Sequence, residues 1–137
     1  MMFKTHVAAS LFFASIFISD FLSLFVFLFA SLLPDIDTKT SFLGRIVNIG
    51  WIFRHRSIMH SIWVCGLIAF GIYAVIPGLA VPFIAGYMLH LLLDALSHEG
   101  VRLFYPLGKV KGFMKVGGIT ENFIFLAAVA GTVVVLI

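Results

Sequence analysis

The stretch HLLLDALSH (residues 90–98) decides how the rest of this sequence is interpreted. It continues an apolar run that begins at Leu79, a pattern that predicts the second half of a membrane-spanning helix. His90, Asp94 and His98 recur every four residues, and at about 100° per residue they stay on one stripe of such a helix. Ionisable side chains inside a membrane span are costly and mark functional sites. Three of them on one face predict a bound cation.

The composition is that of an integral membrane protein. The 137 residues are 62% hydrophobic and include sixteen Phe, and the mean hydropathy is +1.17. A soluble domain of this length has too little interior for so much apolar surface. We expect one domain over residues 1–137, embedded in the plasma membrane with several spans. No small-residue cleavage pattern precedes Pro34, so we expect the N-terminal apolar run to be retained rather than removed as a signal peptide.

The cysteine content and the net charge exclude several kinds of site and partner. The single cysteine, Cys65, excludes an internal disulfide and a zinc site built from cysteines. The net charge is +3, and the basic residues lie in the gaps between apolar runs, where they orient a membrane protein. Nucleic-acid binding requires a larger basic patch than this. The expected partners are therefore membrane lipids rather than nucleic acid.

The first apolar segment, residues 5–33, allows two interpretations. As a single helix it would be about 43 Å long, more than the roughly 30 Å of the hydrocarbon core requires. Alternatively Ser19 and Asp20 form a turn and an N-cap between two short helices, 5–18 and 21–33. Each short helix would be only about 20 Å long.

Three further spans follow at residues 58–76, 79–98 and about 121–137. Pro77-Gly78 forms an uncharged turn between the first two, and Thr120 is the expected cap of the last. The predicted fold class is an all-α, polytopic membrane bundle of about five helices.

The positive charges favour the hairpin over the single long helix. All nine Lys and Arg lie in residues 1–4, 39–56 or 102–115. The positive-inside rule assigns all three segments to the cytoplasmic side. The N-terminus reaches that side only if residues 5–33 cross into the membrane and return. The hairpin would also bring the polar residues of the chain to one end of the bundle.

Histidines and aspartates dominate the residues that could carry chemistry. They lie at the ends of the predicted helices or beside them: His6, Asp35, Asp37, His55, His60, His90, Asp94 and His98. Imidazole and carboxylate ligands without thiolates suit zinc, or a harder ion such as manganese. The set exceeds one tetrahedral site and fits a site with two or three metal ions, bridged by carboxylates.

All of these residues except His60 also have a structural interpretation. His6 would be an interface residue, and Asp35 and Asp37 would end a helix in water. His55 would belong to a solvated basic loop. His90 and Asp94 would form a hydrogen-bonded pair between helices, and His98 would interact with a helix dipole. The metal hypothesis depends on their convergence at one side of the membrane.

Several motifs together resemble the YdjM-like family of membrane-bound metal-dependent hydrolases. They are Thr5-His6, LLPDID at 32–37, His55-Arg56 followed by His60-Ser61, HLLLD at 90–94, and Tyr105-Pro106. The resemblance covers nearly the whole chain, with the motifs in the family's order. It implies a distant similarity to the fold of zinc-dependent phospholipase C and single-strand nucleases, a helical bundle with a three-zinc cluster.

The resemblance also implies a set of ligands. His6 matches the early histidine ligand, Asp35 or Asp37 the aspartate, and His60 the next histidine. His90 and Asp94 match a His-x-x-x-Asp pair in which the aspartate bridges two ions. The later His and Glu ligands of the soluble enzymes have no clear counterpart after His98.

These observations predict a metal-dependent hydrolase acting on a phosphoester, such as a lipid headgroup at the cytoplasmic leaflet. Arg56 would bind the phosphate in its planar fork. Whichever of Asp35 and Asp37 does not bind metal would orient a histidine or the attacking water. The alternatives are a metal-ion carrier or sensor without hydrolytic activity, and a structural bundle whose polar residues pair internally.

Overall fold

The computed structural model describes residues 1–37 and 58–137. This part of the chain holds five α-helices: α1 (Phe3–Phe17), α2 (Phe21–Leu32), α4 (Ile62–Val75), α5 (Ala80–Ala95) and α6 (Ile119–Leu136). Three short 3-10 helices join them: η1 (Leu33–Asp37), η2 (Ile58–His60) and η3 (Pro77–Leu79). Two isolated bridges are the only β-type pairing among these residues. The predicted all-α bundle is confirmed.

The first apolar segment is a hairpin, as the charge pattern indicated. α1 ends at Phe17, and the carboxylate of Asp20 caps α2 by accepting a 2.8 Å hydrogen bond from the Ser23 N–H. The cap satisfies one of the orphan N–H groups at the start of α2. The long-helix alternative is therefore wrong.

The predicted helix through His98 is also wrong, because α5 ends at Ala95. The Ser97 hydroxyl donates to the carbonyl oxygen of Asp94, and Ser97 bridges to Met114. The His98 N–H donates to the Met114 carbonyl oxygen at 2.8 Å. These tertiary partners replace the next helical turn. His98 is therefore exposed and lies off the stripe that carries His90 and Asp94.

The last helix begins slightly earlier than predicted. Gly118 is the N-cap of α6, so Thr120 lies inside the first turn rather than at the cap. α6 packs mainly on α1, and most of its apolar surface is exposed. By length and composition, Pro77–Ala95 and Ile119–Leu136 are the two described helical segments able to cross a membrane. The other three α-helices are apolar but shorter.

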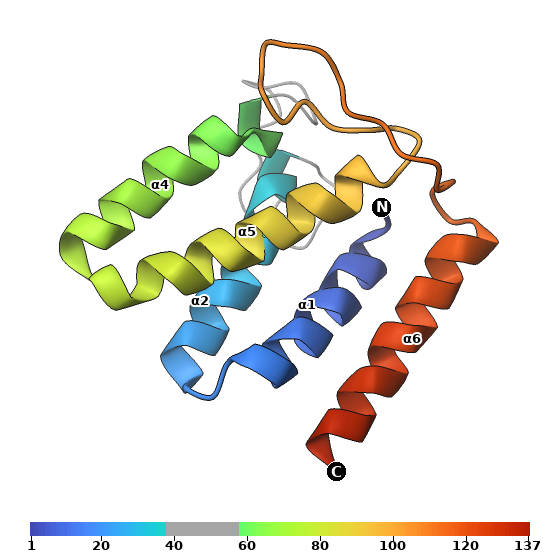
Figure 1. The fold of residues 1–137 in the computed structure, drawn as a ribbon, viewed down its shortest axis with the longest axis horizontal. Helices are drawn as coiled ribbons and strands as arrows, with labels where there is room; N and C mark the ends of the chain where they lie inside the picture. The colour runs from blue at the N-terminus through green and yellow to red at the C-terminus, as the bar shows by residue number, and fades with distance from the viewer. Residues whose placement is uncertain (38–57) are drawn as a thin grey trace.

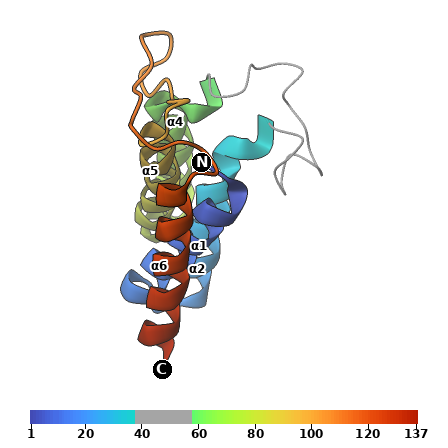
Figure 2. The ribbon, with the colours of Figure 1, turned by 90° about the vertical axis from the view of Figure 1, so that its right-hand side faces the viewer.

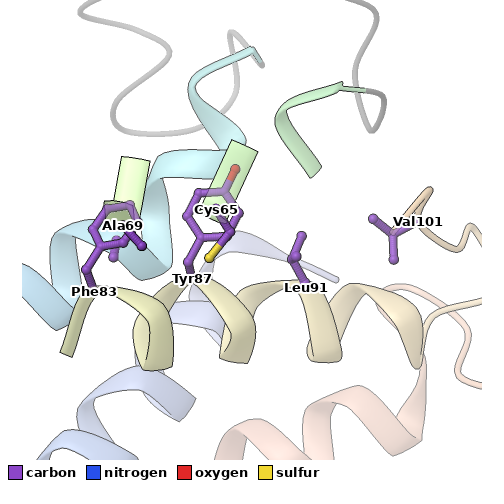
Figure 3. Packing of buried hydrophobic residues seen from close by; sticks show 7 residues of the cluster. Cys65, Ala69, Phe83, Tyr87, Leu91 and Val101 are labelled. Atoms are coloured by element: carbon purple, nitrogen blue, oxygen red, sulfur yellow. The ribbon is translucent and has the colours of Figure 1, made fainter. Parts of the chain in front are cut away.

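The core lies where α5 packs between α2 and α4. Figure 3 shows Phe83, Tyr87 and Leu91 along α5, with Cys65 and Ala69 of α4 facing two of them. All five side chains are buried. On the other side, α5 approaches α2 at Gly86, where an added Cβ would collide with the backbone of Phe27. Burial of apolar side chains in this layer supplies the main packing energy of the fold.

The helix ends meet at one end of the bundle. Figure 1 shows the N-terminus, η1, η2 and the end of α5 gathered there, while the α1–α2 and α4–α5 turns lie away from it. The C-terminus lies at the opposite end in both views (Figures 1 and 2). The polar ends of four segments are thus brought together next to an apolar body.

We expect Gly86→Ala to destabilise the bundle. The new methyl group would meet the Phe27 carbonyl, part of a helix backbone that cannot move without shifting α2. Overpacking of this kind costs about 1–3 kcal/mol. Thermal unfolding of the detergent-solubilised protein measures the effect.

Gly66→Ala is the matched control, since a Cβ added at Gly66 would meet no atom within 4 Å. This substitution on α4 should leave the melting temperature unchanged or raise it slightly, because Ala favours helix more than Gly. Equal melting temperatures for the Gly86 and Gly66 variants would contradict the close α2–α5 contact.

Candidate metal centre

Five ionisable side chains from four elements converge at the polar end of the bundle. They are His6 of α1, Asp35 of η1, His60 of η2, and His90 and Asp94 of α5. The three histidines and Asp94 are almost fully buried, and Asp35 is partly exposed. Burying so many ionisable groups in an apolar bundle is costly unless they are paired or hold a cation.

Two histidines, His60 and His90, each lie close to the carboxylates of Asp35 and Asp94. His60 Nε2 lies 3.5 Å from Asp35 Oδ1 and 3.6 Å from Asp94 Oδ2. His90 Nε2 lies 3.7 Å and 4.0 Å from the same two oxygens. Ligands on a tetrahedral zinc ion are about 3.3 Å apart, given metal–ligand bonds of about 2.0 Å. The four His–carboxylate distances are only slightly longer than this spacing. We call Asp35, His60, His90 and Asp94 the four-donor set.

The tautomer of His90 follows from its backbone contact. His90 Nδ1 lies 2.7 Å from the carbonyl oxygen of Ser31, which can only accept, so Nδ1 carries the proton. His90 Nε2 then presents a lone pair, and it has no hydrogen-bond partner among the described residues. A buried imidazole with one nitrogen fixed by a carbonyl and the other left open is the usual state of a metal-binding histidine. The residues present thus fit a divalent ion.

Asp94 faces two directions. Its Oδ2 points to His60 and His90, whereas Oδ1 lies 3.3 Å from His6 Nε2 and also accepts from the Met1 amino group. The ring of His6 stacks on His90, with centroids 4.1 Å apart. Since His90 has only one open nitrogen, it cannot serve an ion on each side. Asp94, by contrast, directs one carboxylate oxygen to each side. Its predicted role as a bridge between two ions stays a prediction.

The whole chain matches one protein family. The family model described as "YdjM inner membrane protein" covers residues 1–137. The chain belongs to the YdjM family.

Two curated relatives are similar over part of their length. Each is named "Inner membrane protein YdjM", one from Escherichia coli (strain K12) and one from Shigella flexneri. Both are 35% identical to this chain over 55% of it. The match spans 44% of each relative, so the chain corresponds to less than half of those proteins. No solved structure matches.

The structure brings together five of the residues predicted to bind metal in this YdjM family member. His6, Asp35, His60, His90 and Asp94 form two overlapping groups that share His90, with the ligand atoms of each group within 4.8 Å of one another. Their role as ligands remains a prediction. His98 lies outside both groups, because the chain leaves the helix before it.

Three other predicted residues lie beyond what the structure describes. Arg56 and His55 fall in residues 38–57, outside the described residues. Asp37 ends η1, but its side chain is likewise not described. Their predicted roles in phosphate binding, metal binding and water orientation therefore stay predictions.

Sequence reasoning missed the residues that hold the ligands in place. The Tyr87 hydroxyl donates to the Met59 carbonyl oxygen and so fixes the backbone just before His60. Its position three residues before His90 on the same helical face was the available signal. The Ser31 carbonyl could not be identified, since any residue supplies a backbone oxygen.

We expect His90→Ala to lower the bound metal of the purified protein by at least about tenfold, because a tetrahedral site needs its full ligand set. His90 is a member of both groups, and its loss leaves Asp94 and Asp35 with too few neutral donors. Elemental analysis after equilibration with Zn²⁺ measures the content.

His98→Ala is the matched control, since it removes an exposed histidine three residues past the end of α5. It should keep the wild-type metal content. Equal metal content in the two variants would contradict the assignment of His90 as a ligand.

Proposed function

We propose that this membrane protein is a metal-dependent hydrolase that cleaves a phosphoester, such as a lipid headgroup. The observation that carries the proposal is the spacing of the four-donor set, together with the second carboxylate oxygen of Asp94 directed at His6. This arrangement suits two neighbouring divalent ions, zinc or manganese, joined by one carboxylate. Bridged pairs of this kind are typical of enzymes that transfer or hydrolyse phosphate esters.

When bound, the ions would lower the pKa of water and offset the negative charge of the phosphoryl oxygens. The protein's own groups would orient these partners. Ser31 holds the His90 ring, and Tyr87 holds the backbone next to His60. Asp37 would orient a histidine or the attacking water, and Arg56 would bind the phosphate in its planar fork.

The position of the site favours a small or lipid-borne substrate. His90 lies five residues before the end of α5, so the site is about 8 Å below the helix end. The three histidines and Asp94 are nearly inaccessible, and apolar side chains are exposed on the surrounding helices. A lipid headgroup reaches this depth from within the bilayer, whereas a folded nucleic acid is too bulky.

The proposed orientation places the cluster at the cytoplasmic face of a multi-pass inner membrane protein. The support is the distribution of Lys and Arg, which follow the polar end of the bundle in residues 1–4 and 102–115. The described ligands all lie at that end, whereas a pathway for ion transport would require ligands along the span.

We expect turnover of a phosphodiester or phospholipid in the presence of Zn²⁺ or Mn²⁺, and its loss on chelation. A panel of phosphodiesters and phospholipids, assayed with the purified protein in detergent, provides the measurement. Asp94→Asn should reduce turnover at least about a hundredfold, because it removes the bridging charge. His98→Ala serves again as the control with wild-type turnover.

An enzyme and a metal-ion carrier differ in a second measurement. Metal uptake into proteoliposomes that is lost in Asp94→Asn, with no turnover of any panel substrate, would replace the hydrolase with the carrier. Absence of both bound metal and turnover would leave a structural bundle.

Impermeant maleimide labelling in spheroplasts tests the orientation. Leu107→Cys introduces an exposed thiol at the polar end, and Gly78→Cys introduces one at the α4–α5 turn. We expect only Gly78→Cys to be labelled before the membrane is permeabilised, and both afterwards. The native Cys65 is buried, so the wild type is the blank. The reverse pattern would contradict the cytoplasmic site.

A further inference from the structure

Glu121 is a buried carboxylate that the proposed mechanism does not use. It lies in the first turn of α6 and is fully inaccessible to solvent. Its two oxygens accept from two backbone N–H groups, one from Met2 and one, at 2.6 Å, from Gly117. Gly117 takes a positive φ of 72°, which turns the chain so that its N–H points at the carboxylate. Glu121 thus ties the start of α6 to the residue before α1.

That tie leads directly to His6. Met2 is the N-cap of α1, and its carbonyl oxygen accepts from the amide of His6 at 3.3 Å and from that of Thr5 at 3.0 Å. Two consecutive hydrogen bonds therefore connect the Glu121 carboxylate to the backbone of His6. The N-termini of α1 and α6 both approach this carboxylate, and their dipoles favour its charged form. These backbone donors compensate the buried charge.

The four-donor set is held by different elements. Its members come from η1, η2 and α5, and α5 packs mainly on α2 and α4. His6 alone belongs to α1, whose largest contact is with α6. A change at the α1–α6 junction should therefore move His6 and the Met1 amino group relative to Asp94, and leave in place the elements that carry the four-donor set.

We propose that Glu121 is a positioning residue that sets His6 against Asp94 and thereby controls the affinity of the second metal ion. The inference rests on the proposed two-ion site. Glu121 contacts neither the ions nor substrate and acts through Met2 and the first turn of α1. Replacing the carboxylate by an amide would leave one of the two part-buried N–H groups facing an NH2 donor instead of an acceptor, and would free the start of α1 to shift.

Stepwise Zn²⁺ titration of the metal-free protein tests the inference. The wild type should bind two ions per chain. Glu121→Gln should bind the first ion with unchanged affinity and the second at least about tenfold more weakly, as for other residues that orient a metal ligand. His6→Ala removes the proposed ligand itself, and its titration therefore shows the result expected when the second ion no longer binds.

Asn122→Ala is the matched control for the α1–α6 contact. Asn122 is the neighbour of Glu121, and its side chain accepts an exposed hydrogen bond from Lys4 Nζ at 3.1 Å. This variant removes a link between the same two helices without touching Met2. It should bind both ions as the wild type does, because exposed polar contacts contribute little.

A merely structural role for Glu121 gives a different result, in which both ions weaken together or neither changes. Either outcome overturns the inference.

Glu121→Asp keeps the charge and provides the same test if the Gln variant does not fold, because its shorter side chain cannot reach both N–H groups. A wild type that binds a single ion also overturns it but leaves the four-donor set intact. A wild type that binds no ion overturns the proposed function itself.

Discussion

The close approach of α5 to α2 is the constraint on which the site depends. Gly86 removes the side chain that would hold the two helices apart, so the α2 backbone reaches α5 at Phe27. One turn further along each helix, Ser31 and His90 meet, and the carbonyl of one accepts from the imidazole of the other. The same contact that closes the core therefore fixes the tautomer and direction of His90, a predicted metal ligand. The contact that packs the two helices and the contact that orients His90 lie on successive turns of α2 and α5.

Electrostatics explains why the polar residues gather at one end. Three imidazoles and two carboxylates inside an apolar bundle would each lose hydration, and the loss is tolerable only if they compensate one another or share a cation. The helix termini contribute as well, because the starts of α1 and α6 supply N–H groups to the Glu121 carboxylate. The exposed apolar surface of α6 has the opposite requirement, because it is favourable only in contact with lipid. The molecule thus separates a dense polar end from an apolar body.

Membership of the YdjM family establishes the kind of membrane protein, and the side-chain geometry adds the chemical hypothesis. The matched relatives are described only as inner membrane proteins, and more than half of each lies outside the match. Hydrolysis is therefore inferred from the donor atoms themselves. A fold or family similarity would not decide the reaction, whereas the number, type and spacing of ligands restrict it.

The helical hairpins and the membrane class were predictable from local pattern. Apolar run length, the Asp20 cap and the Pro77-Gly78 turn are read within a few residues, and the positions of Lys and Arg selected the hairpin over the single helix. The stripe of His90 and Asp94 followed from helical periodicity. The extension to His98 failed because Ser97 and Met114, far apart in sequence, pair and end the helix.

By itself, the sequence determined an all-helical membrane protein with histidines and aspartates near the ends of its helices. Only the tertiary structure decided that Asp35 joins the four-donor set, that Asp94 reaches to both sides, and that Glu121 ties α6 to the start of α1. The physical reason is that these relations join segments up to 119 residues apart. Whether residues so far apart in sequence meet in space depends on how whole helices pack, and no local sequence pattern carries that information.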